Sequence, residues 1–118
     1  MSCDLNKQDD CIFCKIIAGD FGTEFVYEDD YVVAFDDISP QAPVHTLIVP
    51  RRHVANLEDN PSPELLAQVF GAASKIAEIK GINKQGYRVI QNNGKGGGQT
   101  VFHLHVHVMG GKALDEKL

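Results

Sequence analysis

The feature that most constrains the fold is a stretch near the C-terminus, FHLHVHVMGG, in which apolar residues and histidines alternate. Successive side chains of a β-strand point to opposite faces, so this alternation predicts a strand that is buried on one face only. We therefore expect a strand over residues 100–109. Its core face would carry Phe102, Leu104, Val106 and Val108. Its other face would carry His103, His105 and His107.

Turn and capping residues divide the rest of the chain into short elements. Besides the histidine strand, strands are expected over 24–29, 31–37, 45–52 and 87–92. Helices are expected over 11–19, with Asp10 as N-cap, and over 60–81, with Ser62 as N-cap, Pro63 in the first turn and Gly81 at the end. The longer helix carries an apolar stripe of Leu65, Val69, Ala72, Ile76 and Ile79. One long and one short helix among strands joined by short loops predict an α+β domain with an antiparallel sheet of about five strands.

Composition limits the function classes. The 118 residues suit one domain over 10–118 behind a flexible tail of residues 1–9. A net charge of −5 argues against nucleic acid or an anionic membrane as partner, because both attract basic surfaces. No apolar run approaches the roughly 20 residues of a membrane helix, and the first ten residues do not resemble a secretory signal. We expect a cytoplasmic protein.

The row of three histidines has three explanations. A polar outer face is the simplest, although Thr, Lys or Glu would serve as well. Metal binding is the second, but outward neighbours on a strand lie about 6.8 Å apart, so three could share one ion only if the strand bent sharply. Nucleophilic attack on phosphorus is the third. An imidazole with a pKa of about 6.5 is largely neutral at pH 7, and a neighbouring imidazolium stabilises phosphoryl oxygens.

Two further motifs accompany the histidines. The loop over 93–99 is rich in glycine, which lets backbone N–H groups approach an anion, although a plain connector would look the same and the P-loop spacing is absent. Cys11 and Cys14 form a C-x-x-C pair on one face of the first helix. In a reducing compartment that spacing indicates metal ligands or a redox pair, while small buried hydrophobic residues are the alternative.

The stretch HLHVHVM resembles the signature His-φ-His-φ-His-φ-φ of the histidine-triad (HIT) family, where φ is apolar. The resemblance extends through CIFCKIIAG, YEDDYVVAFDDISPQAPVHTLIVPRRHV, the long helix and GGGQTVFHLHVHVMGG. Within the family, the chain is most similar to the purine nucleoside phosphoramidase branch. The C-terminal tail GGKALDEKL departs from that branch, because it lacks the aromatic and proline residues that follow the double glycine there.

The resemblance implies catalytic roles. His105, the middle histidine, would attack the α-phosphorus and form a nucleotidyl-histidine intermediate. His107 and His45 would lie beside it, contact the phosphate and share protons. Thr100 stands where the branch has a serine that helps to protonate the leaving amine.

The resemblance also implies a nucleotide site. The purine would rest in an apolar slot of Ile12, Phe13, Ile16, Phe35, Ile38 and Leu47. Asp37 would accept hydrogen bonds from the ribose, while Asn92 and the backbone of Gly98, Gln99 and Thr100 would reach the phosphate together with His105 and His107. Core packing explains the apolar positions equally well, and Asp37 beside Asp36 could simply begin a turn.

A structural Zn²⁺ held by two cysteines and two histidines is common in relatives with CIFC, and here the resemblance assigns it to Cys11, Cys14, His53 and His103. No catalytic metal is required in the family. The resemblance further implies a homodimer whose sheet continues across the interface, with the long helix near the contact.

The expected function is hydrolysis of purine nucleoside 5′-phosphoramidates, which are amine conjugates of AMP or GMP. One alternative is a dinucleoside-polyphosphate hydrolase of the same family, because GQTV before the triad resembles that branch. The other alternative is a nucleotide-binding or scaffold module without catalysis. The set of His45, His105, His107 and Thr100 argues against the latter, because a binder needs no nucleophile.

Overall fold

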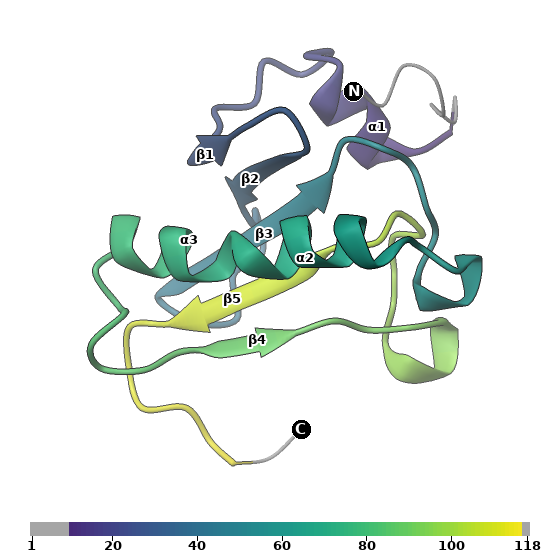
Figure 1. The fold of residues 1–118 in the computed structure, drawn as a ribbon. Coiled ribbons are helices and arrows are strands. Elements are labelled where there is room, and N and C mark those ends of the chain that lie inside the picture. Colours follow the sequence, from purple (N-terminus) through teal and green to yellow (C-terminus); the bar gives the residue numbers. More distant parts are fainter. Residues whose placement is uncertain (1–9, 117–118) are drawn as a thin grey trace.

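The computed structural model describes residues 10–116. The tail expected over residues 1–9 lies outside the described residues. Five strands form one antiparallel sheet in the order β1-β2-β3-β5-β4 (Figure 1). The strands are β1 Tyr27–Glu28, β2 Val32–Asp36, β3 Val44–Pro50, β4 Arg88–Ile90 and β5 Val106–Gly110. The expected α+β architecture with about five antiparallel strands is confirmed.

The long helix consists of α2 Pro63–Gly71 and α3 Ala73–Ile79. Ala72 between them keeps right-handed helical dihedrals, so the two segments run on as one helix across the sheet in Figure 1. Ser62 caps the start as expected, because its hydroxyl accepts a hydrogen bond from the Leu65 N–H at 3.1 Å. Gly81 ends the helical region with a φ of +74°. None of the helices within residues 10–116 combines the length and hydrophobicity needed to span a membrane.

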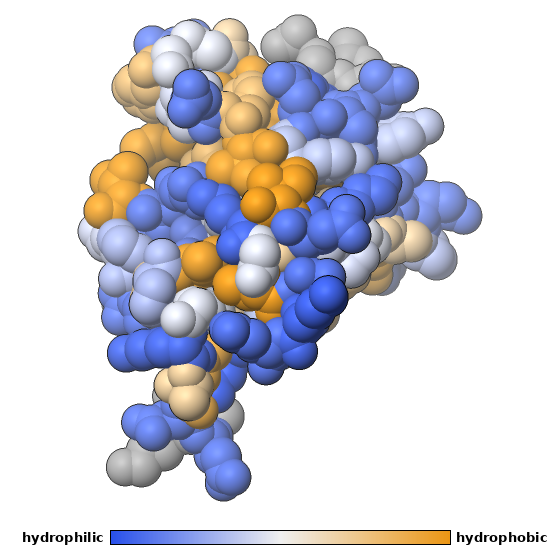
Figure 2. Space-filling view, turned by 90° about the vertical axis from the view of Figure 1, so that its left-hand side faces the viewer, coloured by the Kyte–Doolittle hydropathy of each residue, from blue (hydrophilic) through white to orange (hydrophobic). Residues whose placement is uncertain are grey.

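Most of the expected apolar stripe of this helix is buried. Leu65, Val69, Ala72 and Ile76 lie in the main core, whereas Ile79 is 55% exposed, so the prediction for Ile79 is wrong. Ile79 is the last residue of α3, where the chain leaves the sheet. Other large apolar side chains also remain at the surface, and Figure 2 shows hydrophobic groups on one face among hydrophilic ones.

The sheet has two differently covered faces. The main core joins α2 and α3 to Val32, Ala34, Ile48, Leu104, Val106 and Val108. A second core, on the other face, joins the short helix α1 (Ile12–Ile17) to Val33, Phe35, Leu47 and Val49. Because side chains alternate along a strand, His107 on β5 and its partner Leu47 on β3 point toward the α1 face. Alternation along β5 therefore places His107 on the face that α1 covers.

The histidine strand is shorter than expected. β5 begins only at Val106, so His103 and His105 lie in irregular backbone before it. There the Leu104 N–H donates to the Val54 carbonyl at 2.7 Å, a partner in the loop after β3. The predicted burial of Leu104, Val106 and Val108 is confirmed. Phe102 is 46% exposed, which corrects its predicted place in the core.

Candidate active site and metal centre

A hollow of about 280 Å³ opens on the α1 face of the sheet. Its wall consists of Ile12, Phe13, Ile16, Thr23, Phe35, Asp36, Asp37, Ile38, Leu47, Thr100, Val101, His105 and His107. One side is apolar and the other carries imidazole, hydroxyl and carboxylate groups. All six residues predicted for the purine slot lie in this wall. Thr23 and Val101 were not predicted, because neither carries a chemical signal in the sequence.

The phosphate-binding prediction for the glycine loop fits less well. The Gly98 N–H donates to the Lys95 carbonyl at 3.1 Å, and the Gln99 N–H donates to the Gly94 carbonyl at 3.0 Å. The Asn92 side chain likewise donates to a loop carbonyl, that of Gly97, at 2.8 Å. These three predicted donors are thus used inside the loop and do not line the hollow. Thr100 is the residue of the predicted loop that does.

The Gln99 side chain holds the loop in place. Its amide nitrogen donates to the carbonyls of Ala55 at 2.7 Å and Val101 at 3.0 Å. Its oxygen accepts from the Asn56 side chain at 2.9 Å and from the Gly94 N–H at 2.8 Å. Gln99 is only 3% exposed. A buried amide with all its hydrogen-bonding capacity used fixes the backbone on both sides of Thr100.

His105 is buried in the wall of the hollow, and its surroundings show which of its two ring nitrogens carries the hydrogen. Its Nδ1 lies 2.7 Å from the carbonyl oxygen of His103. A carbonyl only accepts, so Nδ1 carries the hydrogen and Nε2 has the free lone pair. The ring packs edge-to-face on Phe13, with centroids 5.0 Å apart. Burial lowers the pKa of His105, which favours the neutral ring.

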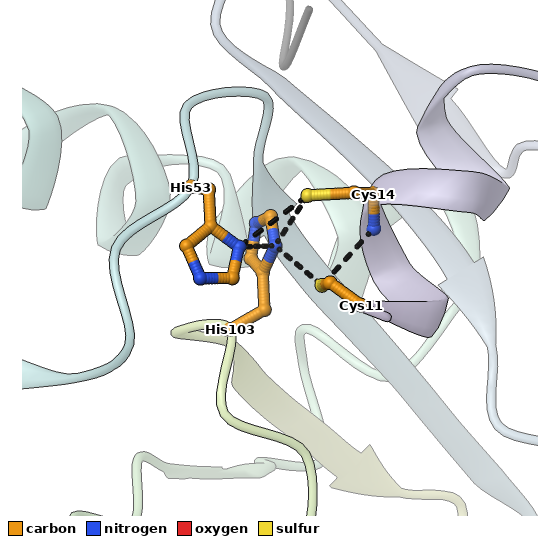
Figure 3. A group of neighbouring side chains, drawn as sticks. All are labelled: Cys11, Cys14, His53 and His103. Carbon is orange, nitrogen blue, oxygen red and sulfur yellow. Dashed lines mark hydrogen bonds between the residues drawn. The ribbon is translucent and has the colours of Figure 1, made fainter. Parts of the chain in front are cut away.

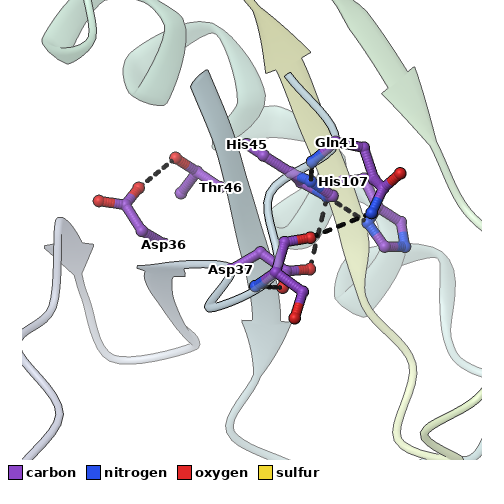
Figure 4. Close-up of polar contacts among 7 residues, drawn as sticks. Asp36, Asp37, Gln41, His45, Thr46 and His107 are labelled. Atoms are coloured by element: carbon purple, nitrogen blue, oxygen red, sulfur yellow. Dashed lines mark hydrogen bonds and ion pairs between the residues drawn. The ribbon is translucent and has the colours of Figure 1, made fainter. Parts of the chain in front are cut away.

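His107 and His45 form a second imidazole pair beside His105 (Figure 4). The Nε2 of His45 lies 2.9 Å from Nδ1 of His107 and 3.6 Å from a carboxylate oxygen of Asp37. The rings of His105 and His107 have centroids 5.0 Å apart. Burial, reinforced by the neighbouring imidazoles, lowers the pKa of His107 to about 4, and the Asp37 charge opposes this shift. The three histidines predicted for catalysis therefore meet at one place.

The two neighbouring aspartates point to opposite faces of the sheet (Figure 4). Asp36 accepts hydrogen bonds from Thr46 at 2.8 Å and Lys80 at 2.9 Å. Asp37 accepts the Ser39 N–H at 2.8 Å and also contributes to the wall of the hollow. Asp37 therefore both caps a turn, through Ser39, and lines the hollow, so the two explanations of this residue do not exclude each other.

A separate group of Cys11, Cys14, His53 and His103 lies next to the hollow (Figure 3). Their potential ligand atoms all fall within 4.8 Å of one another. The distances are 3.4 Å from Cys11 Sγ and 3.6 Å from Cys14 Sγ to His103 Nδ1. The Nδ1 of His53 lies 3.3 Å from Cys14 Sγ and 3.1 Å from His103 Nδ1. Zinc bonds of about 2.0–2.3 Å would set tetrahedral ligand atoms about 3.3–3.8 Å apart, so this group fits a four-coordinate ion.

The surroundings of this group also suit a cation. The Nε2 of His103 lies 2.8 Å from the Pro50 carbonyl, so it donates there and leaves a lone pair on Nδ1 among the sulfurs. Burial lowers the pKa of His103 to about 4, which leaves its ring neutral, and raises the pKa of Cys11 to about 11, so the Cys11 thiol keeps its proton until a cation displaces it. Cys11 accepts the Cys14 N–H at 3.3 Å and is the N-cap of α1, which corrects the expected cap at Asp10.

Comparisons with known proteins agree with this geometry. Residues 19–114 match the model of the HIT domain. The purine nucleoside phosphoramidase of Escherichia coli is 43% identical over 112 residues, which cover 93% of this chain and 94% of that protein. A HIT family hydrolase from Clostridium thermocellum has a TM-score of 0.89 at 43% identity, over 95% of this chain and 99% of that one. A HIT family hydrolase from Legionella pneumophila has a TM-score of 0.86 at 42% identity, over 91% and 97%. The chain belongs to the HIT family.

Proposed function

We propose that this protein hydrolyses purine nucleoside 5′-phosphoramidates and cleaves the bond between phosphorus and nitrogen by way of a nucleotidyl-histidine at His105. The observation that carries the proposal is the unprotonated Nε2 of His105 in the wall of a hollow that also contains His107 and Thr100. The Escherichia coli relative named purine nucleoside phosphoramidase supports this choice of substrate class.

The hollow offers a binding site for each part of such a substrate. The apolar side, with Phe13, Phe35 and Leu47, suits a purine ring. The Asp37 carboxylate lies in the same wall and can accept hydrogen bonds from ribose hydroxyls. The phosphate then falls near His105 and His107, which is the order of groups in a nucleoside monophosphate.

The reaction proceeds in two displacements. Nε2 of His105 attacks the α-phosphorus, a bond forms between them, and the bond from phosphorus to nitrogen breaks. The leaving nitrogen gains one proton, which the Thr100 hydroxyl passes on from solvent. Water then attacks the same phosphorus, releases the nucleoside monophosphate and a proton, and frees Nε2. None of these steps requires a metal ion.

The test is His105→Ala assayed with an AMP–lysine conjugate in which lysine is linked through nitrogen. We expect turnover to be abolished while the fold and the metal content stay unchanged. Rapid quenching of the wild type should trap AMP bound to His105. Retained turnover in the variant, or no adduct with any nucleotide conjugate, would reject the proposal in favour of a binding module.

A dinucleoside polyphosphate is the competing substrate class. Its leaving group is an anionic phosphate, which needs no added proton, whereas an amine does. We therefore expect kcat/KM for the AMP–lysine conjugate to exceed that for diadenosine polyphosphate. Comparison of the two substrates in one preparation decides between the classes.

We also propose that Cys11, Cys14, His53 and His103 bind one structural Zn²⁺. Bound there, the ion would tie α1 to the loop after β3 and to the segment before β5, and it would supply stability rather than chemistry. The distances among the four ligand atoms support the proposal. Metal analysis of the purified protein should give one zinc per chain.

We further propose a homodimer in which the sheet continues across the interface. β4 is an edge strand of the sheet, and Phe70 and Ile79 of the long helix are 41% and 55% exposed. Both an unpaired strand edge and exposed apolar side chains are features of interfaces. Ile79→Glu should shift the protein from dimer to monomer in sedimentation velocity. An unchanged dimer would place the interface elsewhere.

A further inference from the structure

The ring of His45 has a defined partner at each nitrogen (Figure 4). The backbone N–H of Gln41, in the turn between β2 and β3, donates to Nδ1 of His45 at 2.9 Å. The other nitrogen, Nε2, lies 2.9 Å from Nδ1 of His107. His45 is only 5% exposed, so water does not compete for either contact.

These partners determine where the hydrogens lie. A backbone N–H can only donate, so Nδ1 of His45 must present its lone pair and the neutral ring carries its hydrogen on Nε2. That hydrogen is then donated to Nδ1 of His107. His107, which is neutral as well, carries its own hydrogen on Nε2. In this series of hydrogen bonds, His45 and His107 thus both point their N–H in the same direction, away from Gln41.

We propose that the backbone N–H of Gln41 is a positioning group that fixes this direction, so that His107 presents an N–H donor, and not a base, to the bound phosphate. The inference rests on the proposed function, because it gives His107 a role at the same site. A fixed donor stabilises the charge that grows on a phosphoryl oxygen during attack by His105.

The same arrangement excludes His107 as the source of the leaving-group proton. If His107 lost its Nε2 hydrogen, His45 would have to supply another from its own Nε2. His45 could not regain a proton at Nδ1, because the Gln41 N–H occupies that position and cannot be given up at neutral pH. The proton for the amine is therefore left to Thr100 and solvent.

The first test measures the tautomers directly. The zinc-loaded protein is labelled uniformly with ¹⁵N, and correlations between ring nitrogens and ring carbon-bound hydrogens are recorded at pH 7 without substrate. We expect His45 and His107 both to be protonated on Nε2 and unprotonated on Nδ1. A hydrogen on Nδ1 of either ring would overturn the proposal. Because no substrate is present, this result is independent of whether the protein is a phosphoramidase.

The second test removes the donor. Gln41→Pro lacks the N–H, whereas Gln41→Ala keeps it and serves as the matched control. For the proline variant we expect His45 to become a mixture of tautomers, kcat for the AMP–lysine conjugate to fall by about tenfold or more, and KM to change by less than about threefold. The alanine variant should retain the wild-type tautomer. A folded proline variant with wild-type tautomer and kcat would contradict the proposal.

A third comparison applies even if the proline variant does not fold. The glutamine of His107→Gln can accept from His45 and donate to phosphate through one amide, whereas His107→Ala and the carboxylate of His107→Glu cannot donate. We expect kcat of the glutamine variant to exceed that of the other two by about tenfold. Equal losses in all three would overturn the donor role. If the wild type itself turns over no conjugate, the proposed function fails while the tautomer measurement still stands.

Discussion

Two groups of potential metal ligands lie on the same face of the sheet, and we propose different chemistry for each of them. One consists of Cys11, Cys14, His53 and His103, and the other of Asp37, His45 and His107. In both groups the potential ligand atoms lie within 4.8 Å of one another. Residue type and proximity therefore do not separate the proposed metal centre from the proposed catalytic site.

The difference lies in the backbone partner of one nitrogen in each group. His103 donates Nε2–H to the Pro50 carbonyl, so its inward nitrogen has a lone pair. His45 accepts the Gln41 N–H at Nδ1, so its inward nitrogen has a hydrogen. A lone pair binds a cation, whereas an N–H repels one and donates to an anion. We infer that a backbone acceptor in one group and a backbone donor in the other favour a cation and an anion, respectively.

The largest effect that tests this comparison concerns zinc affinity. Cys14→Ser should lower the affinity for Zn²⁺ by more than about 100-fold, because it removes a thiolate ligand. Asp37→Asn, the matched change in the other group, should leave affinity and stoichiometry unchanged. Competition with a chromogenic chelator measures both variants. A second zinc that is lost in the Asp37 variant would show that the two groups are alike.

The next effect concerns turnover. His107→Ala should lower kcat for the AMP–lysine conjugate by about 10²-fold, because a donor to the phosphate is lost, and the zinc content should not change. Steady-state kinetics and metal analysis of the same preparation provide the check. Loss of zinc along with activity would mean that the two groups are not separable.

Much of the fold and the site follows from patterns that act locally. Alternation at Leu104, Val106 and Val108 predicts which face of the last strand is buried, and Ser62 predicts where the long helix begins. The resemblance predicts which histidines meet, because it also covers the upstream stretch that contains His45. These features depend on neighbours in sequence or on a motif that spans the site.

The features that were missed depend on partners far away in the chain. The regular strand begins late, at Val106, because the Leu104 N–H donates to the Val54 carbonyl in another loop, and no periodicity in the sequence reports such a contact. The burial of the Gln99 side chain likewise depends on its hydrogen bonds to the Asn56 side chain and the Ala55 carbonyl. The role that we propose for Gln41 depends on its backbone N–H, which every residue except proline has, so the sequence carries no signal for it.

A smaller effect should connect the two groups. The carbonyl of His103, a residue of the proposed metal group, accepts a hydrogen bond from Nδ1 of the proposed nucleophile His105 at 2.7 Å. Removal of the metal frees His103 to move, and the resulting misplacement of His105 should lower kcat by about tenfold, within the loss that a shift of roughly 1 Å causes. Activity is measured before and after dialysis against a chelator, and again after zinc is restored.

Circular dichroism is the control for this experiment, since it shows that the metal-free protein is folded. Unchanged kcat in folded, metal-free protein would mean that the two groups act independently.

The smallest effect is the dependence of stability on pH. Burial lowers the pKa of His107 from about 6.5 to about 4. Between these pH values the unfolded chain binds a proton at this position and the folded chain does not, so the free energy of unfolding decreases as the pH falls from 6.5 to 4. His107→Gln removes this contribution. Its stability should therefore vary less with pH in this window, by up to about 1.4 kcal/mol per pH unit.

Urea unfolding of both proteins at several pH values measures the two slopes. Parallel slopes across the window would show that His107 is protonated in the folded protein, and would remove the neutral ring on which the contrast between the two groups depends.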